Sequence, residues 1–453
     1  MPLPAILILD IGKTNKKMLL FDDRYKLLRE ECTQLRETVD EDGFPCEDLN
    51  ELTRWTEQKF SEILSNKDFE IKAINFSAYG ASFVHLNKEL KPVTPLYNYL
   101  KPFPENLKKQ FYSQYGGESL IAKQTASPVL GSLNSGMQLY RLKYEKPGVY
   151  DLIKYSLHLP QYISCIISKK PATDISSVGC HTNLWDFGKG QYHDWVFKEQ
   201  LDRKLAPVYK GDKTFGTAYG NNGLQSGIGL HDSSAALIPY LFSFHEPFIL
   251  ISTGTWCISL NPFNHAELTN DELRQDCLCY LSYEGKPVKA SRLFAGYEHE
   301  QQVKRIAAHF NKGVISFQAV RYNPESVDKA QRIGKIKQIP FSEIDLTEFK
   351  TYEDAYHRLM YGIIRQQIKS TNLVLQGTTV KRIFVDGGFG KNPIYMQLLA
   401  KNLPGIEVYS AMIPQASALG AALAIHKSWN KHPVPSDLIE LKYYANTETN
   451  YSI

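Results

Sequence analysis

The chain opens with two apolar runs separated by a short polar turn. Residues 6–9 are apolar, residues 12–15 form a turn that contains glycine, and residues 18–21 are apolar again before two aspartates. This pattern predicts a β-hairpin. Residues 26–35 continue the alternation, so we expect a third antiparallel strand.

Helical and extended patterns then alternate. In residues 49–64 the apolar side chains recur at the spacing of one helical face, which predicts an amphipathic helix. Residues 71–76 predict a buried strand that ends in the small and polar residues 77–82. A helix between strands of one sheet is typical of an α/β fold. The proline-rich residues 91–104 predict a surface loop or a lid.

The middle of the chain combines helices with polar connections. Residues 127–144 predict a turn that feeds a helix capped near Asn134, and residues 157–167 predict a buried helix. Residues 174–182 are small and polar, as expected for a loop, either one that lines a ligand or an ordinary one. Residues 217–236 form a glycine-rich extended run that gives way to the start of a helix.

The second half repeats the opening pattern. Residues 248–260 again show a strand, a small polar turn and a strand, and residues 276–282 predict a third strand. This repetition predicts two halves that are built on one plan and face each other across a cleft. The remaining predicted elements are a helix over 356–375, a buried strand over 382–386, a helix over 393–401, a strand over 406–409 and a helix of small residues over 416–429.

Length, charge and cysteine content narrow the class of protein. A length of 453 residues favours two domains, and the 52 basic and 48 acidic residues are too evenly mixed to support nucleic-acid binding. Cys277 and Cys279 would have Cα atoms roughly 7 Å apart on a strand, which disfavours a disulfide, so we expect reduced cysteines. No apolar run reaches the roughly 18 residues of a membrane span, and no leader pattern is evident. We therefore expect a cytoplasmic protein without membrane contact.

Three turns rich in Gly, Thr or Asn each follow an apolar strand, at residues 12–15, 252–255 and 387–392. Such turns present backbone N–H groups and small donors to anionic groups such as phosphates. The patterns GxxxxGK[ST] and GxGxxG are absent, which disfavours a P-loop or Rossmann enzyme. Asp10 ends a buried strand, where a carboxylate needs a cation or donors, so it is a candidate magnesium ligand. For the first turn, an ordinary surface hairpin with solvated lysines is the alternative.

These motifs resemble those of the FGGY carbohydrate kinases over about residues 5–430. Residues 10–17 are similar to the first phosphate motif of the family, in which an aspartate, here Asp10, organises magnesium. Residues 252–256 are similar to the second phosphate motif, in the form seen in rhamnulose and fuculose kinases. Residues 387–392 are similar to the adenosine motif. The resemblance implies that ATP or its phosphates contact Gly12, Thr14, Asn15, Lys16, Lys17, Thr253, Gly254, Thr255, Gly387, Gly388 and Asn392.

The resemblance also implies an acceptor site. His231 and Asp232 resemble the His-Asp pair of the deoxyketose branch, so Asp232 is the implied catalytic base and His231 orients the sugar. Residues 78–84 resemble the sugar-contacting turn of rhamnulose kinases, which places Tyr79 and Gly80 against the substrate. The residues alone leave other roles open, since Asp232 before two serines also suits a helix N-cap. His231 and Tyr79 also suit packing.

Four charged residues have no single role on sequence grounds. Lys13 departs from the small residue usual at that place, and it either contacts a phosphate or points to solvent. Asp386 is either structural or part of the third turn. Arg292 and Glu298 fall in a predicted loop, where solvated charges are expected.

Together these features predict an α/β fold of two actin-like (ribonuclease H-like) domains, residues 1–245 and 246–453, with the active site in the cleft between them. The resemblance implies the superfamily that contains sugar kinases, heat-shock chaperone ATPases and actin. It further implies an ATP- and Mg²⁺-dependent kinase of a small ketose, preferably a 6-deoxyketohexose such as L-rhamnulose or L-fuculose. Another ketose or a polyol is the alternative acceptor. A sugar-sensing regulator and an actin-like filament protein are the alternative classes, and a homodimer is left open.

Overall fold

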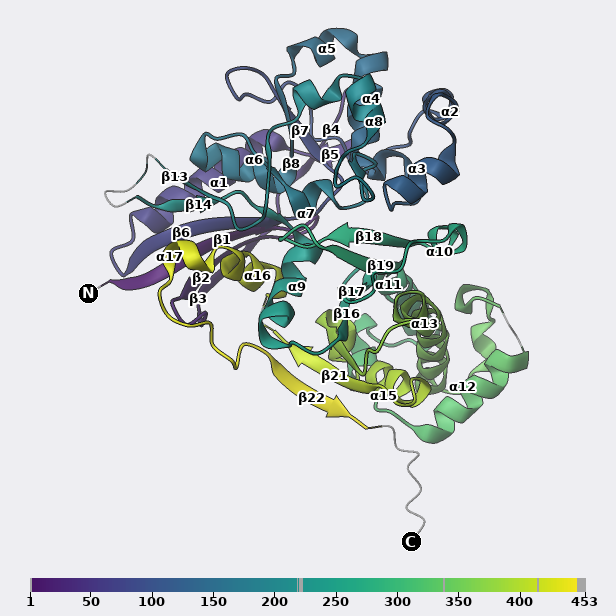
Figure 1. The fold of residues 1–453 in the computed structure, drawn as a ribbon. Coiled ribbons are helices and arrows are strands. Elements are labelled where there is room, and N and C mark those ends of the chain that lie inside the picture. Colours follow the sequence, from purple (N-terminus) through teal and green to yellow (C-terminus); the bar gives the residue numbers. More distant parts are fainter. Residues whose placement is uncertain (1, 218, 220–222, 337–338, 414, 446–453) are drawn as a thin grey trace.

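The computed structural model describes residues 2–217, 219, 223–336, 339–413 and 415–445. It contains two seven-stranded sheets, which follow one another along the chain (Figure 1). The strands of the first sheet are β1 (Leu3–Ile11), β2 (Lys16–Asp22), β3 (Leu27–Thr33), β6 (Phe69–Ala78), β13 (Thr214–Gly216), β14 (Gln225–Gly227) and β15 (Leu230–His231). Those of the second are β16 (Phe248–Thr253), β17 (Cys257–Asn261), β18 (Cys277–Leu281), β19 (Pro287–Leu293), β20 (Arg382–Asp386), β21 (Glu407–Met412) and β22 (Glu440–Tyr444).

The two sheets share one plan of strand pairing. In the first, β1 pairs antiparallel with β2 and parallel with β6, and β2 continues to β3. In the second, β16 pairs antiparallel with β17 and parallel with β20, and β17 continues to β19. The order β3-β2-β1-β6 therefore corresponds to β19-β17-β16-β20, which confirms the predicted repetition.

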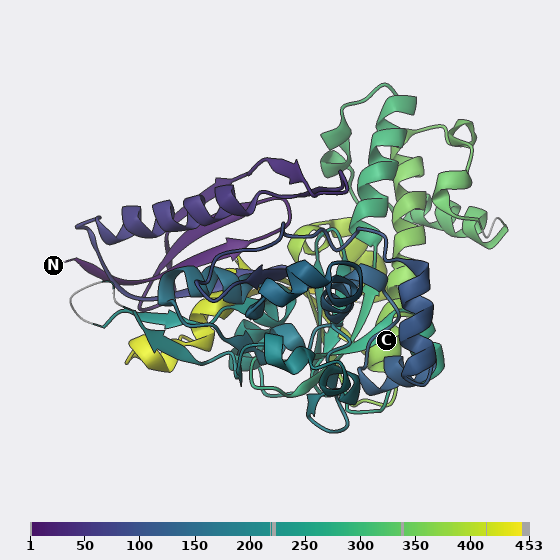
Figure 2. The same ribbon diagram turned by 90° about the horizontal axis from the view of Figure 1, so that it is seen from above.

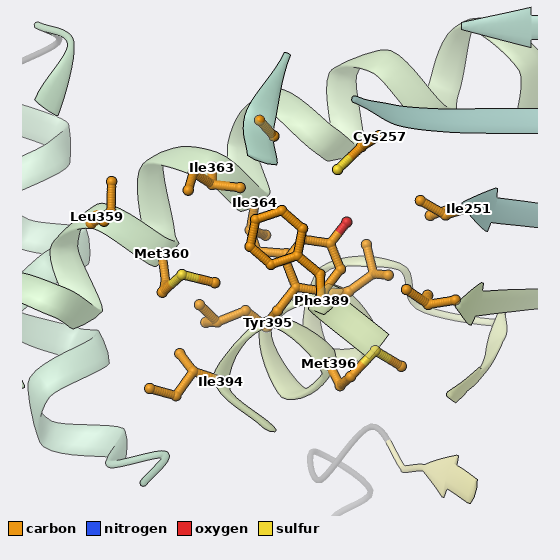
Figure 3. Close-up of a cluster of buried hydrophobic side chains, with 14 of the residues drawn as sticks. Ile251, Cys257, Leu359, Met360, Ile363, Ile364, Phe389, Ile394, Tyr395 and Met396 are labelled. Atoms are coloured by element: carbon orange, nitrogen blue, oxygen red, sulfur yellow. The ribbon is translucent and has the colours of Figure 1, made fainter. Parts of the chain in front are cut away.

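The period-two pattern of each central strand supplies two buried faces. In β1, Ala5, Leu7 and Leu9 pack toward α1 (Leu49–Leu64) and α6 (Leu159–Ser168), while the residues between them face the opposite side. Figure 2 shows α1, in purple, along one side of the opening strands. In β16, Ile249 and Ile251 face α13 (Tyr352–Leu375) and α15 (Pro393–Asn402). A part of this second core is drawn in Figure 3.

Two helices cross between the halves (Figure 1). The helix α9 (Asp232–Ser243), which follows the first sheet in the chain, packs Leu237 and Tyr240 against the second sheet. The helix α16 (Ala416–Ala424), from the end of the chain, packs against the first sheet. The two helices touch closely, since a Cβ on Gly420 would lie 1.8 Å from the carbonyl oxygen of Ala235. The halves therefore share a small-residue helix pair in the middle of the molecule.

The remaining elements surround this frame. Short strands pair as β4 (Glu37–Val39) with β5 (Pro45–Glu47), β7 (Phe83–Leu86) with β8 (Tyr155–His158), β9 (Thr173–Asp174) with β12 (Val208–Tyr209), and β10 (Trp185–Asp186) with β11 (Gln191–Tyr192). The other helices are α2 (Glu105–Gln114), α3 (Glu118–Gln124), α4 (Ser135–Glu145), α5 (Pro147–Leu152), α7 (Ile175–Val178), α8 (Asp194–Lys198), α10 (Asn270–Arg274), α11 (Ala295–His309), α12 (Pro324–Ile336), α14 (Gly387–Gly390) and α17 (His426–Trp429). Single 3-10 turns lie at Gly131–Leu133, Leu201–Lys204, Val314–Ala319, Phe341–Glu343 and Leu346–Glu348.

Several local predictions need correction. The third strand of the second meander is β19, because β19 pairs directly with β17, whereas β18 pairs with the outer edge of β19. Four residues of the predicted loop over 174–182 form the short helix α7, which Asp174 caps by accepting a hydrogen bond from Ser177 N. The predicted helix over 416–429 is divided into α16 and α17. The third glycine turn begins with the helical turn α14. All seven cysteines are free, as predicted.

Candidate active site

Three parallel strands bring the predicted catalytic residues to one edge of the first sheet. Asp10 of β1 lies beside Ser77 of β6, and Ser77 lies beside Leu230 of β15. His231 follows on β15, and Asp232 begins α9. Because the carboxyl ends of parallel strands meet at the same edge, Asp10 and Asp232 converge there from positions more than 200 residues apart.

Asp232 has the environment expected of a general base. It is the first residue of α9, whereas His231 is the N-cap, so the structure does not use Asp232 as a cap. Its Oδ1 accepts the backbone N–H of Ser233 at 2.6 Å and lies 3.2 Å from Nε2 of His231. Asp232 is partly exposed, and desolvation by the groups that cover the rest of its carboxylate raises its pKa to about 6, whereas burial lowers the pKa of His231 to about 4. Near neutral pH the site therefore holds a carboxylate beside an uncharged imidazole.

Asp10 lies close enough to Asp232 for their charges to interact. Burial is the main cause that raises the pKa of Asp10 to about 6, and the negative charge of Asp232 adds to it. The hydroxyl of Ser417 donates to Oδ2 of Asp10 at 2.8 Å. Among the residues that the structure describes, no group of three or more His, Cys, Asp or Glu side chains is arranged to hold a metal ion. Asp10 thus offers a single carboxylate next to a second negative charge.

The turn at Tyr79 and Gly80, which is predicted to contact the sugar, closes on the imidazole of His231. A Cβ on Gly80 would lie 2.9 Å from Cδ2 and 3.0 Å from Nε2 of His231, so only glycine fits without a shift. Cys180 packs on the same ring, with its sulfur 3.3 Å from Nε2. Tyr79, one residue earlier, is buried and donates its hydroxyl to Glu47 at 2.9 Å. The structure therefore brings Gly80 to His231, and it points the Tyr79 hydroxyl toward Glu47.

The first phosphate turn is tightly closed. The N–H of Gly12 donates to the carbonyl of Asn15 at 2.9 Å, and Thr14 is exposed at the tip. Lys16 is only 2% exposed and donates to the carbonyls of Gly12 and Lys13 at 3.1 and 3.0 Å. A phosphate contact by Lys16 would require one of these bonds to break.

Lys17 joins the first turn to the second half of the chain. Its ammonium donates to Oε1 of Gln415 at 2.5 Å and lies 3.5 Å from Glu30. Gln415 also donates to Glu30 and directly precedes α16. Lys13, in contrast, stays within the first half, where it lies 3.3 Å from Glu37. The structure therefore pairs Lys13 with carboxylates instead of leaving it free in solvent.

The second and third turns are joined through their backbones. The hydroxyl of Thr253 donates to the carbonyl of Asp386 and accepts the N–H of Phe389 at 3.0 Å. Gly387 has φ +76°, and a Cβ there would lie 1.9 Å from the carbonyl oxygen of Thr253. Burial raises the pKa of Asp386 to about 6, and its Oδ1 accepts the N–H of Thr253 at 3.3 Å. Asp386 and Thr253 thus hold these two turns together.

The other residues predicted to contact the nucleotide differ in how accessible they are to a ligand. Gly254, Thr255, Gly387 and Gly388 are exposed and can be approached by a ligand. The side chain of Asn392 already has partners in the protein. Its oxygen caps α15 by accepting backbone N–H groups of the first turn, and its nitrogen donates to the hydroxyl of Tyr356 at 2.7 Å.

Two residues near the site were not predicted from sequence. Tyr99, in the proline-rich segment, lies with its ring centre 5.9 Å from that of Tyr79. Burial and the charge of Asp232 raise its pKa, so it lies near the predicted base. Arg292 was expected in a loop, but it lies in β19, is 8% exposed and pairs with Asp276 at 2.7 Å. Its guanidinium carbon lies 5.2 Å from the ring centre of Trp256, an aromatic contact that sequence spacing could not show.

Comparison with known proteins identifies the family. A model of the N-terminal domain of the FGGY family of carbohydrate kinases matches residues 5–238, which is more than half of the chain. The protein belongs to the FGGY family. A model of the FGGY C-terminal domain matches residues 245–320. FGGY kinases are phosphotransferases that use ATP and an alcohol group as the acceptor.

Similar proteins extend the comparison. This FGGY chain is 22% identical to the rhamnulokinase of Halalkalibacterium halodurans over 193 residues, which are 40% of the chain and 39% of that rhamnulokinase. The xylulose kinase of Lactobacillus acidophilus has a similar structure, with a TM-score of 0.81 and 15% identity over 98% of this chain and 94% of that one. A carbohydrate kinase of Novosphingobium aromaticivorans has a TM-score of 0.76 and 20% identity over 98% and 97%. These structures confirm the predicted fold class. None of the described helices is both long and apolar enough to cross a membrane.

Proposed function

We propose that this protein is an ATP- and Mg²⁺-dependent kinase that phosphorylates a hydroxyl of a small ketose. The observation that carries the proposal is the convergence of Asp10 and Asp232 at one sheet edge, with His231 and the closely packed Gly80 beside them. We also propose that residues 1–245 and 246–453 are its two domains, with the site between them.

Asp232 accepts the proton of the attacking sugar hydroxyl in this proposal. Its side chain is 38% exposed, so an acceptor can reach it, and its pKa of about 6 leaves it deprotonated at neutral pH. His231, neutral and fixed by its contacts with Gly80 and Cys180, holds the sugar in place. The attack is then directed at the γ-phosphate, which the three turns position.

The donor set at Asp10 fits Mg²⁺ that is bound together with a nucleotide. Mg²⁺ in phosphate sites commonly takes one or two carboxylates and completes its shell with phosphate oxygens and water. Asp10 supplies one carboxylate, and a cation there would offset its repulsion from Asp232. When bound, Mg²⁺ would neutralise the charge that develops on the transferred phosphoryl group.

A 6-deoxyketohexose such as L-rhamnulose or L-fuculose is the proposed acceptor. The second phosphate turn with Trp256, the pair of His231 and Asp232, and the partial similarity to a rhamnulokinase all favour this branch. The structural similarity to a xylulose kinase supports the alternative, another ketose or a polyol. A homodimer remains a separate proposal, which light scattering on the purified protein would test.

A coupled assay of ADP release over a panel of ketoses, aldoses and polyols tests the function. We expect turnover with L-rhamnulose or L-fuculose that stops when EDTA removes Mg²⁺. Turnover with only xylulose or glycerol would move the protein to the alternative substrate class. No sugar-dependent ADP release with any member of the panel would contradict a kinase and favour a sugar-sensing regulator.

A further inference from the structure

A buried carboxylate connects the first phosphate turn to the sugar turn. Glu47, at the end of β5, is 6% exposed. Its Oε2 lies 3.1 Å from the ammonium of Lys16, and its Oε1 lies 3.6 Å from that of Lys13. The same Oε1 accepts the hydroxyl of Tyr79 at 2.9 Å. Glu47 is therefore the common partner of two lysines from one turn and a tyrosine from the other.

Lys16 determines the shape of the phosphate turn. The ammonium of Lys16 donates to the carbonyls of Gly12 and Lys13 and forms an ion pair with Glu47, whose Oε2 lies 3.1 Å away. At 2% exposure this charge needs its partners, because an isolated ion in such a place is strongly destabilising. The carbonyls of the turn are consequently fixed by a group that Glu47 neutralises.

Tyr79 carries the connection to the acceptor site. Its phenol is buried, and burial together with the charge of Glu47 keeps its pKa well above the usual value, so it remains a donor. Gly80 follows it directly and has no free space, since a Cβ there would meet the ring of His231 at 2.9 Å. A shift of Tyr79 would therefore move the backbone that touches His231.

We infer that Glu47 is a positioning residue that couples sugar binding to nucleotide binding. This inference rests on the proposed function, because it assigns the turn at residues 12–15 to the nucleotide and the turn at Gly80 to the sugar. In this inference Glu47 acts through Tyr79 and Lys16 and contacts neither ligand itself. A sugar that contacts Gly80 changes the position of Tyr79, which is hydrogen-bonded to Glu47. The resulting shift of Glu47 changes the position of the Lys16 ammonium, which holds the turn at residues 12–15. Each ligand then favours the arrangement that binds the other, which is reciprocal by thermodynamic linkage.

The matched test compares Glu47→Gln with Glu37→Gln. Glu37 pairs with the same Lys13 at 3.3 Å, but its side chain is 54% exposed and lies outside the buried cluster. Calorimetry measures the affinity for Mg²⁺ with a non-hydrolysable ATP analogue, with and without saturating L-rhamnulose. We expect the sugar to raise nucleotide affinity about tenfold in the native protein and in Glu37→Gln, and not in Glu47→Gln.

Tyr79→Phe provides a second variant if Glu47→Gln fails to fold. It removes one hydroxyl and leaves both lysine contacts of Glu47 in place. We expect it to fold and to lose most of the tenfold effect of the sugar on nucleotide affinity. Native-like coupling in both Glu47→Gln and Tyr79→Phe would overturn the inference. If L-rhamnulose changes nucleotide affinity in none of the proteins, and no other sugar of the panel gives turnover, the proposed function fails and the coupling fails with it.

Discussion

The first phosphate turn and its counterpart in the second half follow the same strand-turn-strand plan, but different interactions hold them. Charged side chains fix the first turn, where Lys16 binds two of its carbonyls and Lys17 reaches Gln415. The second turn is fixed to the third by the Thr253 hydroxyl, which bonds to the backbone of Asp386 and Phe389, and by close backbone contact, since a Cβ on Gly387 would lie 1.9 Å from the carbonyl oxygen of Thr253. One fold plan can therefore hold a strand-turn-strand unit in two physically different ways.

This difference predicts how each turn responds to change. A backbone that packs on another backbone has no room for a side chain, so substitution there should disrupt the local fold. A turn held by ions tolerates new side chains better, but its shape depends on which charges remain. We therefore expect folding defects from the second half of the site and binding defects from the first.

The largest effect is expected for Gly387→Ala. Its φ of +76° and the carbonyl of Thr253 leave no place for a methyl group. We expect a loss of at least about 3 kcal/mol in the free energy of unfolding, measured by chemical denaturation. Gly388→Ala is the matched control, because no atom lies within 4 Å of a Cβ at that position. The control should fold normally and bind nucleotide more weakly, and a native-like stability of Gly387→Ala would refute the backbone contact.

Asp232→Asn tests the chemistry while leaving both turns intact. A positioned general base contributes about a hundredfold or more, so we expect kcat to fall at least that much. Calorimetry should show unchanged affinity for Mg²⁺-ATP, since Asp232 belongs to the acceptor side of the site. Ser233→Ala, which removes only the neighbouring hydroxyl at 3.3 Å, should keep most of the activity. A near-native kcat in Asp232→Asn would exclude it as the base.

Activity should also depend on pH through the same carboxylate. The pKa of Asp232 is raised to about 6, and a base works only when deprotonated, so activity is present above that pH and falls as the pH decreases through it. We expect kcat/KM to drop about tenfold per pH unit below that value. Asp386 has the same pKa of about 6 and serves as the control. If the loss of activity at low pH disappears in Asp386→Asn, that loss does not come from protonation of Asp232.

Much of this structure could be predicted from the sequence because its signals are local. The alternation of apolar residues indicated the opening hairpin, and helical spacing gave α1 with its exact ends. The order of β18 and β19 could not be predicted, since strand pairing depends on partners outside the segment. Contacts such as Lys17 with Gln415, 398 residues apart, have no local signature. The burial of Arg292 likewise depends on Asp276 and Trp256, which the fold brings to it.

The smallest effect is expected at the contact between Lys17 and Gln415, which joins the two halves of the chain. Gln415→Glu keeps the contact with Lys17 but adds a negative charge that neutralises the Lys17 ammonium. The new carboxylate also lies next to Glu30. We expect KM for ATP to rise a few-fold, roughly the strength of a half-exposed ion pair, with kcat less affected. Gln415→Met removes the contact without adding charge and serves as the comparison. Equal kinetics in both variants would show that the charge of Lys17 does not reach the nucleotide.

The central claim is that turns from both halves bind the same phosphates beside one acceptor site. If so, binding of both ligands should draw the halves together and exclude water from the γ-phosphate. Small-angle X-ray scattering can test this directly on the native protein with L-rhamnulose, Mg²⁺ and a non-hydrolysable ATP analogue. We expect the radius of gyration to decrease with both ligands and to change less with either one alone. A scattering profile that stays the same at saturating concentrations of all three would contradict the claim.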